Sequence, residues 1–135
     1  MSARVMAILS AVAVAGAIVA GLLVIGSPAQ QRQQQLDTRR VGDLRTLSYV
    51  VTARWSQTQQ LPAGIAELVD GRSMSRVPAD PSSKTPYDYR VTGQRQFELC
   101  ATFDGASPPQ ELGDFWAHEA GRKCFAFDVD EKVQR

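Results

Sequence analysis

The chain has 135 residues, a formal net charge of +1 and 21% charged residues. This length suits one small domain, and the near-neutral charge does not indicate a strongly charged partner. Because the sequence has no zinc-finger spacing, no RNA-binding motif and no basic run with interleaved aromatic residues, it predicts no nucleic-acid partner.

The first element is an uncharged apolar run from Val5 to Ile25. As a helix rising about 1.5 Å per residue, it would span roughly 30 Å, the thickness of the hydrocarbon core of a bilayer. We therefore expect an N-terminal membrane anchor over residues 1–29 and one domain over residues 30–135. A cleaved signal peptide is the alternative, since Arg4 precedes the run and Ser-Pro-Ala at 27–29 resembles a cleavage site, but the run is longer than signal peptides use. A buried core helix suits so small a domain poorly.

The anchor carries a seam of small residues. Ala13, Ala17 and Gly21 are spaced four apart and therefore share one face of the helix. Small residues at that spacing let a second helix approach closely in lipid. The sequence thus predicts two partners for the anchor: bacterial membrane lipid and a helix of a larger integral membrane protein complex.

The charges after the apolar run bear on the side of the membrane where the domain lies. Between Gln30 and Gln60 the local charge is +3, which the positive-inside rule would keep in the cytoplasm and which anionic head groups attract. Long domains are translocated largely regardless of charge, and paired cysteines favour an oxidising compartment. We therefore expect a single-pass protein of the bacterial inner membrane with its C-terminal domain in the periplasm.

Apolar residues recur with helical spacing between residues 36 and 55, which predicts an amphipathic helix whose apolar stripe packs on another layer. The charged residues of this segment, Arg40 among them, are expected on the other faces. Pro28 is expected to separate this helix from the anchor, because proline interrupts a helix but starts a new one well. The stripe consists of Leu44, Leu47, Val51 and Trp55, with Val41 beside it.

Three later segments alternate apolar and polar residues, which is the period of a half-buried strand. They are residues 87–91, 97–103 and 124–129. A short helix over residues 62–69, with Val69 facing inward and Gly71 ending it, is expected before them. The aromatic enrichment of one face predicts a three-stranded antiparallel sheet on which the amphipathic helix packs. The predicted fold class is α+β.

Cys100 and Cys124 fall out of phase with the large apolar residues of their strands, so both should point away from the helix. If the two strands are neighbours, this matched parity lets the sulfur atoms meet across the sheet. We therefore expect a disulfide, which would stabilise the domain by about 3 kcal/mol in the chain-entropy model. The alternative is two reduced, partly buried cysteines.

His118, the single histidine, raises two further possibilities. With Cys100 and Cys124 it could supply three metal ligands, although the spacing matches no CxxC or HxxxH pattern. With the acidic residues near it, it could serve a hydrolase, although no nucleophile is identifiable beside it. The sequence also has no GxSxG, HExxH, CxxCH or phosphate-binding glycine loop. We expect a non-catalytic chain without metal or cofactor, in which Phe115 and Trp116 cover the open end of the sheet.

Short motifs follow one another in a particular order. After the amphipathic helix come Leu61-Pro62, a short helix, Asp80-Pro81, Pro86-Tyr87-Asp88-Tyr89 and the strand that contains Cys100. From Leu36 to Phe103, this order resembles the major pseudopilins of type II secretion and related type IV pilin-like proteins. The resemblance implies a pilin-like extracytoplasmic domain: a membrane helix, an amphipathic helix and a small antiparallel sheet.

Two properties of that family have no counterpart. Where prepilins have a processing site of Gly followed by Phe-Thr-Leu-Ile-Glu, this chain has Arg4-Val5-Met6-Ala7-Ile8, and its apolar run contains no glutamate. The calcium-loop ligands of pseudopilins are not matched either. The resemblance therefore implies the fold and the location, and it does not imply filament assembly.

Three functions are compatible with these patterns. The first is a permanently anchored, non-catalytic accessory subunit of a bacterial inner-membrane protein complex. The second is a divergent pseudopilin or minor pilin of a secretion or pilus system, for which a cut near Arg4 would be diagnostic. The third is a small periplasmic enzyme or ligand-binding module that uses the His118 loop.

Overall fold

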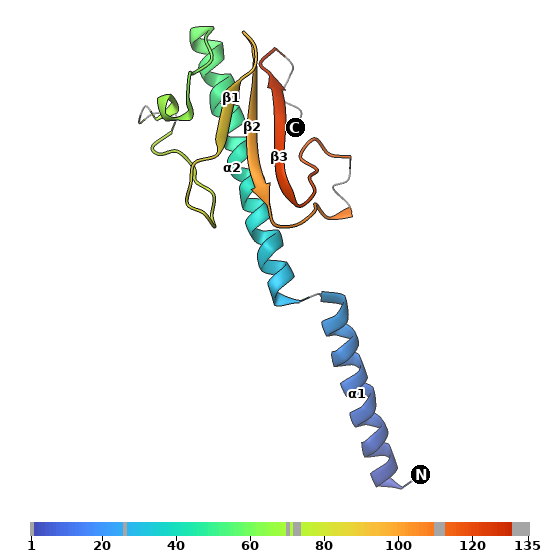
Figure 1. Ribbon diagram of the computed structural model, residues 1–135. Helices are drawn as coiled ribbons and strands as arrows, with labels where there is room; N and C mark the ends of the chain where they lie inside the picture. The colour runs from blue at the N-terminus through green and yellow to red at the C-terminus, as the bar shows by residue number, and fades with distance from the viewer. Residues whose placement is uncertain (1, 26, 70, 72–73, 110–112, 131–135) are drawn as a thin grey trace. The chain divides into compact units, whose positions relative to one another are not determined.

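The computed structural model describes residues 2–25, 27–69, 71, 74–109 and 113–130. The chain divides into two compact units, residues 1–33 and residues 34–135. Its elements (Figure 1) are α1 (Ala3–Ile25), α2 (Pro28–Thr58), a single 3-10 turn η1 (Ile65–Leu68), and the strands β1 (Asp88–Val91), β2 (Gln96–Phe103) and β3 (Gly121–Asp128).

The first unit consists of α1 and the start of α2. By length and composition, α1 is apolar enough to cross a membrane. Its large apolar side chains are exposed, among them Leu22 and Leu23, which is a surface that water disfavours and lipid accepts. α1 ends at Ile25 and α2 begins at Pro28, as expected for a helix restarted by proline; Gly26, between them, lies outside the described residues.

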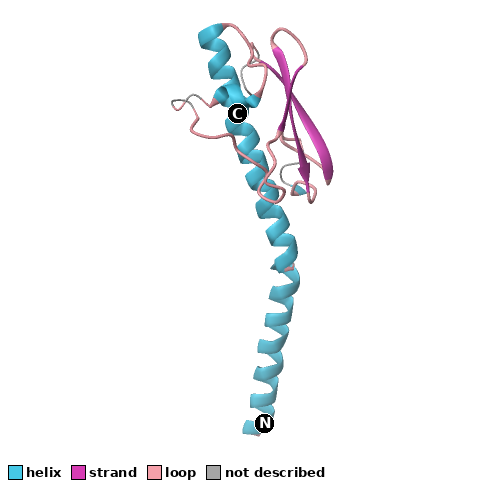
Figure 2. Ribbon diagram, turned by 60° about the vertical axis from the view of Figure 1, so that its left-hand side comes forward, coloured by secondary structure: helices cyan, strands magenta, loops and turns pink. Residues whose placement is uncertain are grey.

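The second unit has two layers, with α2 lying against one face of an antiparallel sheet (Figure 2). The strand order is β1-β2-β3, so that each strand pairs with its neighbour in the sequence. In this register Leu99 lies opposite Tyr89 on one side and Phe125 on the other. The predicted α+β class and the three-stranded antiparallel sheet are confirmed.

Side-chain alternation along β2 explains how the two layers are held together. Phe97, Leu99 and Phe103 are buried in one cluster with Leu44 and Leu47 of α2, because odd-numbered residues of the strand face the helix. Leu44, Leu47, Phe97 and Leu99 are each 0% exposed. The core therefore forms where apolar residues that recur about every 3.6 positions along α2 pack against those that recur at every second position along β2.

Two expectations about the edges of this core are wrong. Trp55 is only half-buried and lies outside the core cluster, because Val51, one turn earlier, is the last buried position of α2. The helix expected over residues 62–69 is reduced to η1, and Val69 is 42% exposed rather than inward-facing. Gly71, which was expected to end this helix, lies three residues after the end of η1 at Leu68 and has a left-handed φ of +74°.

The segment before β3 covers the sheet with aromatic rings, as expected. The Trp116 ring lies 5.0 Å from that of Phe125, and the Phe115 ring lies 5.3 Å from that of Phe127, between ring centroids. Arg45 of α2 extends over Trp116, with its guanidinium carbon 5.5 Å from the ring centroid. These contacts connect α2, the 113–118 segment and β3 in one packed unit.

Candidate functional site

The most concentrated polar chemistry of the second unit surrounds Arg40, one turn before Leu44 on α2. The residue is 3% exposed. Its Nη1 donates to Asp37 Oδ1 and to Asp104 Oδ2, both at 2.7 Å, and its Nε donates to Asp80 Oδ2 at 2.6 Å. One guanidinium thus joins α2, the loop at residues 79–86 and the turn after β2. We call these four residues the Arg40 network.

Two carboxylates of the Arg40 network, those of Asp37 and Asp80, have further donors. Asp37 Oδ1 and Oδ2 accept hydrogen bonds from the backbone N–H groups of Asp104 and Gly105, at 3.0 and 2.9 Å. Asp80 Oδ1 accepts from two backbone N–H groups of its own turn, at 2.8 Å each. Charges buried in this way are tolerated because partners replace the water that they lose.

Ionisation of the Arg40 network follows from these contacts. Burial alone would raise the pKa of Asp80, but the hydrogen bonds from Arg40, Ser83 and Ser82 outweigh it and lower the pKa to about 2. Burial likewise opposes the charge of Arg40, yet the three carboxylates hold its pKa above the ordinary value. Arg40 and Asp80 are therefore both charged at neutral pH.

We predict that acid weakens the domain through Asp80. The pKa of Asp80 in the folded state, about 2, lies below the ordinary 3.8. Its contribution to the free energy of unfolding is therefore complete above the unfolded-state pKa. This contribution is lost as the pH falls through the folded-state pKa. The loss between pH 5 and pH 2 should be about 2 kcal/mol. The check is the free energy of unfolding of the wild type minus that of Asp80→Asn over this range. A difference that stays constant with pH would contradict the assignment.

Two tyrosines of the motif series also tie the chain to the helix layer. Tyr87 Oη donates to Asp43 Oδ2 of α2 at 2.8 Å, and Tyr89 Oη donates to the carbonyl of Pro62 at 3.0 Å. Burial, followed by the bond to Asp43, raises the pKa of Tyr87, and burial, with the charge of Glu67, raises the pKa of Tyr89 to about 12. Both phenols therefore act as neutral donors that fix the entry into β1.

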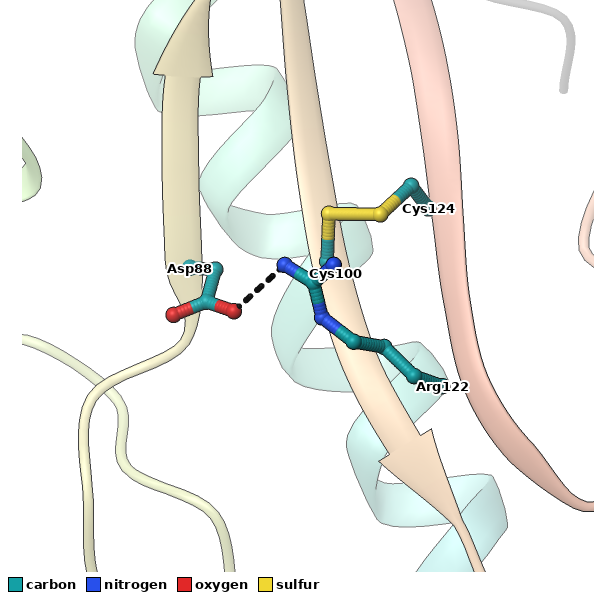
Figure 3. The surroundings of a disulfide bond; sticks show 4 residues. All are labelled: Asp88, Cys100, Arg122 and Cys124. Carbon is teal, nitrogen blue, oxygen red and sulfur yellow. Dashed lines mark hydrogen bonds and ion pairs between the residues drawn. A yellow bond between two sulfur atoms is a disulfide. The ribbon is translucent and has the colours of Figure 1, made fainter.

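The expected disulfide between Cys100 and Cys124 is present. The two residues lie opposite each other in the β2–β3 register, with Cα atoms 4.0 Å apart. The bridge lies on the face of the sheet away from α2, and Arg122 reaches past it to Asp88 with an Nη2–Oδ2 distance of 2.8 Å (Figure 3). It joins only the β2–β3 pair, so α2 is held to the sheet by packing and by the Arg40 network.

The metal hypothesis for His118 is not supported by this geometry. Its ring stacks on Phe103, which faces the helix, at 3.7 Å between centroids, whereas both cysteine sulfur atoms lie on the opposite face and are bonded to each other. Within the described residues, one group of potential ligands lies close together, and it combines Glu98 with the two bridged cysteines. The structure therefore does not bring the three expected ligands together.

The structure places a serine, Ser107, beside His118, but the geometry of the pair does not support the hydrolase hypothesis. His118 Nδ1 lies 2.9 Å from Ser107 Oγ and 3.0 Å from the carbonyl oxygen of Trp116. Because a carbonyl only accepts, the proton belongs on Nδ1, and the ring has no lone pair directed at Ser107. Nε2 is buried and has no hydrogen-bond partner among the described residues. The pair thus fastens the loop before β3 to the turn after β2.

A cavity lies beside His118. Its volume is about 260 Å³, and its walls come from α2, including Thr38, Gly42 and Arg45, and from residues 106–108. A Cβ added at Gly42 would meet nothing within 4 Å. The missing side chain thus leaves room over the middle of α2.

The predicted seam of Ala13, Ala17 and Gly21 lies within α1. A Cβ added at Gly21 would meet nothing within 4 Å, so that position is open to a neighbour. The docking of a second helix there stays a prediction.

The sequence patterns predict an outer face for Arg40 and do not predict the Arg40 network. That placement is wrong, because Asp37 and Arg40 fall in phase with Leu44 and Leu47 on the inner face of α2. The available signal was this phase together with the Asp-x-x-Arg spacing, which allows an i,i+3 pair.

Comparisons of the chain with protein-family models, with curated proteins and with solved structures found no match.

Proposed function

We propose that this chain is a single-pass, membrane-anchored, pilin-like subunit whose C-terminal domain lies in the periplasm and serves a larger inner-membrane complex without catalysing a reaction. The observation that carries the proposal is α1, a helix of membrane-spanning length with its large apolar side chains exposed. A soluble protein seldom presents such a continuous apolar surface to water.

The second unit supports the same proposal. A long helix packed on a small antiparallel sheet with a disulfide is a pilin-like arrangement, and a disulfide favours a compartment outside the cytoplasm. The buried charges of the Arg40 network are engaged with one another, which suits a structural subunit. The missing processing site argues for a permanent anchor rather than for a divergent pseudopilin. A mature N-terminus cut near Arg4 would instead favour the divergent pseudopilin.

The topology can be tested with reporters fused after Arg135. We expect a reporter that is active only in the periplasm to be active, because the disulfide and the length of the following domain favour translocation. A cytoplasmic reporter at the same position is the control. Activity of the cytoplasmic reporter alone would show that the charges after α1 keep the domain inside.

The partner can be tested through the seam of small residues. Replacing Ala17 and Gly21 with leucine should release the chain from its complex while leaving it in the membrane, because bulk on that face prevents close helix packing. The matched control is Ala11→Leu with Ala15→Leu, which adds bulk four residues apart on another face of α1. Co-purification with the same partners in the same ratio after the seam substitution would contradict the docking proposal.

The cavity beside His118 favours a second candidate, a ligand-binding module. Gly42 lines this cavity, and a Cβ added to Gly42 would meet open space. The substitution Gly42→Leu would therefore fill the cavity. A compound that raises the melting temperature of the wild type but not of Gly42→Leu would support this candidate over a purely structural role.

A further inference from the structure

A groove lies between α2 and the loop at residues 76–84. Its volume is about 370 Å³. Figure 1 shows this loop running alongside α2. Three cationic side chains line the groove: Arg39 from the helix, and Arg76 and Lys84 from the loop.

The positive charge of the groove is not neutralised by its own walls. Arg39, Arg76 and Lys84 are exposed, and none of the three takes part in the ion pairs found among the described residues. Among the described residues that line the groove, one is acidic, Asp43, and it already accepts a hydrogen bond from Tyr87. These described residues have a net charge of +2.

The part of the loop that carries Lys84, residues 79–86, is fixed in place. Ala79 and Pro86 pair across its base, and the backbone N–H of Lys84 donates to the carbonyl of Asp80 at 2.9 Å. Asp80 in turn binds Arg40, the helical neighbour of Arg39. Lys84 has φ +61°, a left-handed conformation that an ordinary side chain adopts rarely. These contacts hold Lys84 on the loop beside α2 before any ligand arrives, and Arg76 lines the same groove three residues before the Ala79–Pro86 pair.

We propose that this groove binds a phosphate-bearing anion. Arginine guanidinium groups present paired donors that match phosphate oxygens, and a lysine ammonium adds a point charge. The net charge of +2 matches the charge of a phosphate group. Because the groove is much larger than a phosphate alone, the ligand has a polar body attached, as in a glycerophosphate.

Two sources supply this chemistry, a soluble glycerophosphate and the head group of an anionic lipid. Arg39 comes only eleven residues after Pro28, so the chain tethers the groove within reach of a bilayer if α1 is the anchor. The lipid source rests on the proposed membrane function, whereas the soluble source does not.

The test uses the full-length protein in a neutral detergent. Binding of sn-glycerol 1-phosphate is measured by calorimetry, and binding of phosphatidylglycerol against phosphatidylcholine is counted by native mass spectrometry. The test variant is Arg39→Gln with Arg76→Gln. Its matched control is Arg54→Gln with Arg90→Gln, which removes the same charge from positions that do not line the groove.

We expect each arginine to contribute about fivefold in affinity, so the test variant should bind about 25-fold more weakly while the control changes less than about twofold. Loss of phosphatidylglycerol adducts alone assigns the groove to lipid, and loss of glycerophosphate binding assigns it to a soluble ligand. Absence of both kinds of binding, or equal losses in the two variants, overturns the proposal. Glycerophosphate binding that survives a negative topology result would leave the groove assignment intact and reject only the membrane function.

Discussion

Arg40→Ala is expected to lower the free energy of unfolding by about 3–5 kcal/mol, the range measured when one partner of a buried ion pair is removed. The substitution would leave Asp37 and Asp80, whose side chains are 7% and 13% exposed, without their shared cation. It would also release the loop at residues 79–86 from α2. The measurement is denaturant unfolding of the full-length protein in detergent, followed by tryptophan fluorescence.

Arg39→Ala is the matched control for this experiment. Arg39 is adjacent on the same helix, carries the same charge and is exposed, so its loss should change stability by less than about 0.5 kcal/mol. A cost below about 1 kcal/mol for Arg40→Ala would show that the carboxylates reach water and that the Arg40 network does not hold the loop.

Leu47→Ala should destabilise the domain by about 2–5 kcal/mol, because it removes a fully buried side chain and leaves a cavity between α2 and the sheet. Leu47 is 0% exposed and belongs to the same core cluster as Leu99 and Phe125. The same unfolding assay measures the change, and the dependence on denaturant should keep its slope if the native state stays compact.

Tyr49→Ala provides the comparison for Leu47→Ala. Tyr49 lies two residues away on α2 and is 71% exposed, so truncating it should cost little although its side chain is larger. If the two variants lost similar stability, the apolar stripe of α2 would not be covered by the sheet.

Local periodicity was sufficient to predict the layers of this fold. The spacing of Leu44, Leu47 and Val51 indicated which face of α2 is buried, and the alternation along β2 placed Cys100 on the opposite face from Leu99. A cross-strand disulfide needs two cysteines that point to the same face of neighbouring strands, and the alternation of side chains along a strand shows which face each cysteine takes. These features depend on short-range geometry, so they can be read from the sequence.

The Arg40 network could not be predicted in the same way. Asp80 and Asp104 come from turns far away in the sequence, and no local pattern shows that both approach the same guanidinium. A charged residue is also assigned outward by default, because burial of an unpaired charge is costly. Only the tertiary structure supplies the three partners that make the burial of Arg40 possible.

The order of elements along the chain has a consequence for synthesis. The apolar stripe of α2 leaves the ribosome before β2 and long before β3, although the core cluster needs residues from all three. At about 5–20 residues per second, the stripe waits for several seconds without its sheet. The disulfide cannot close in that interval either, since Cys124 lies in the last strand. A nascent chain that stalls before β3 therefore exposes the apolar stripe of α2 and the free thiol of Cys100. Once residues 121–128 add the final strand, the sheet can cover the stripe and Cys124 can pair with Cys100.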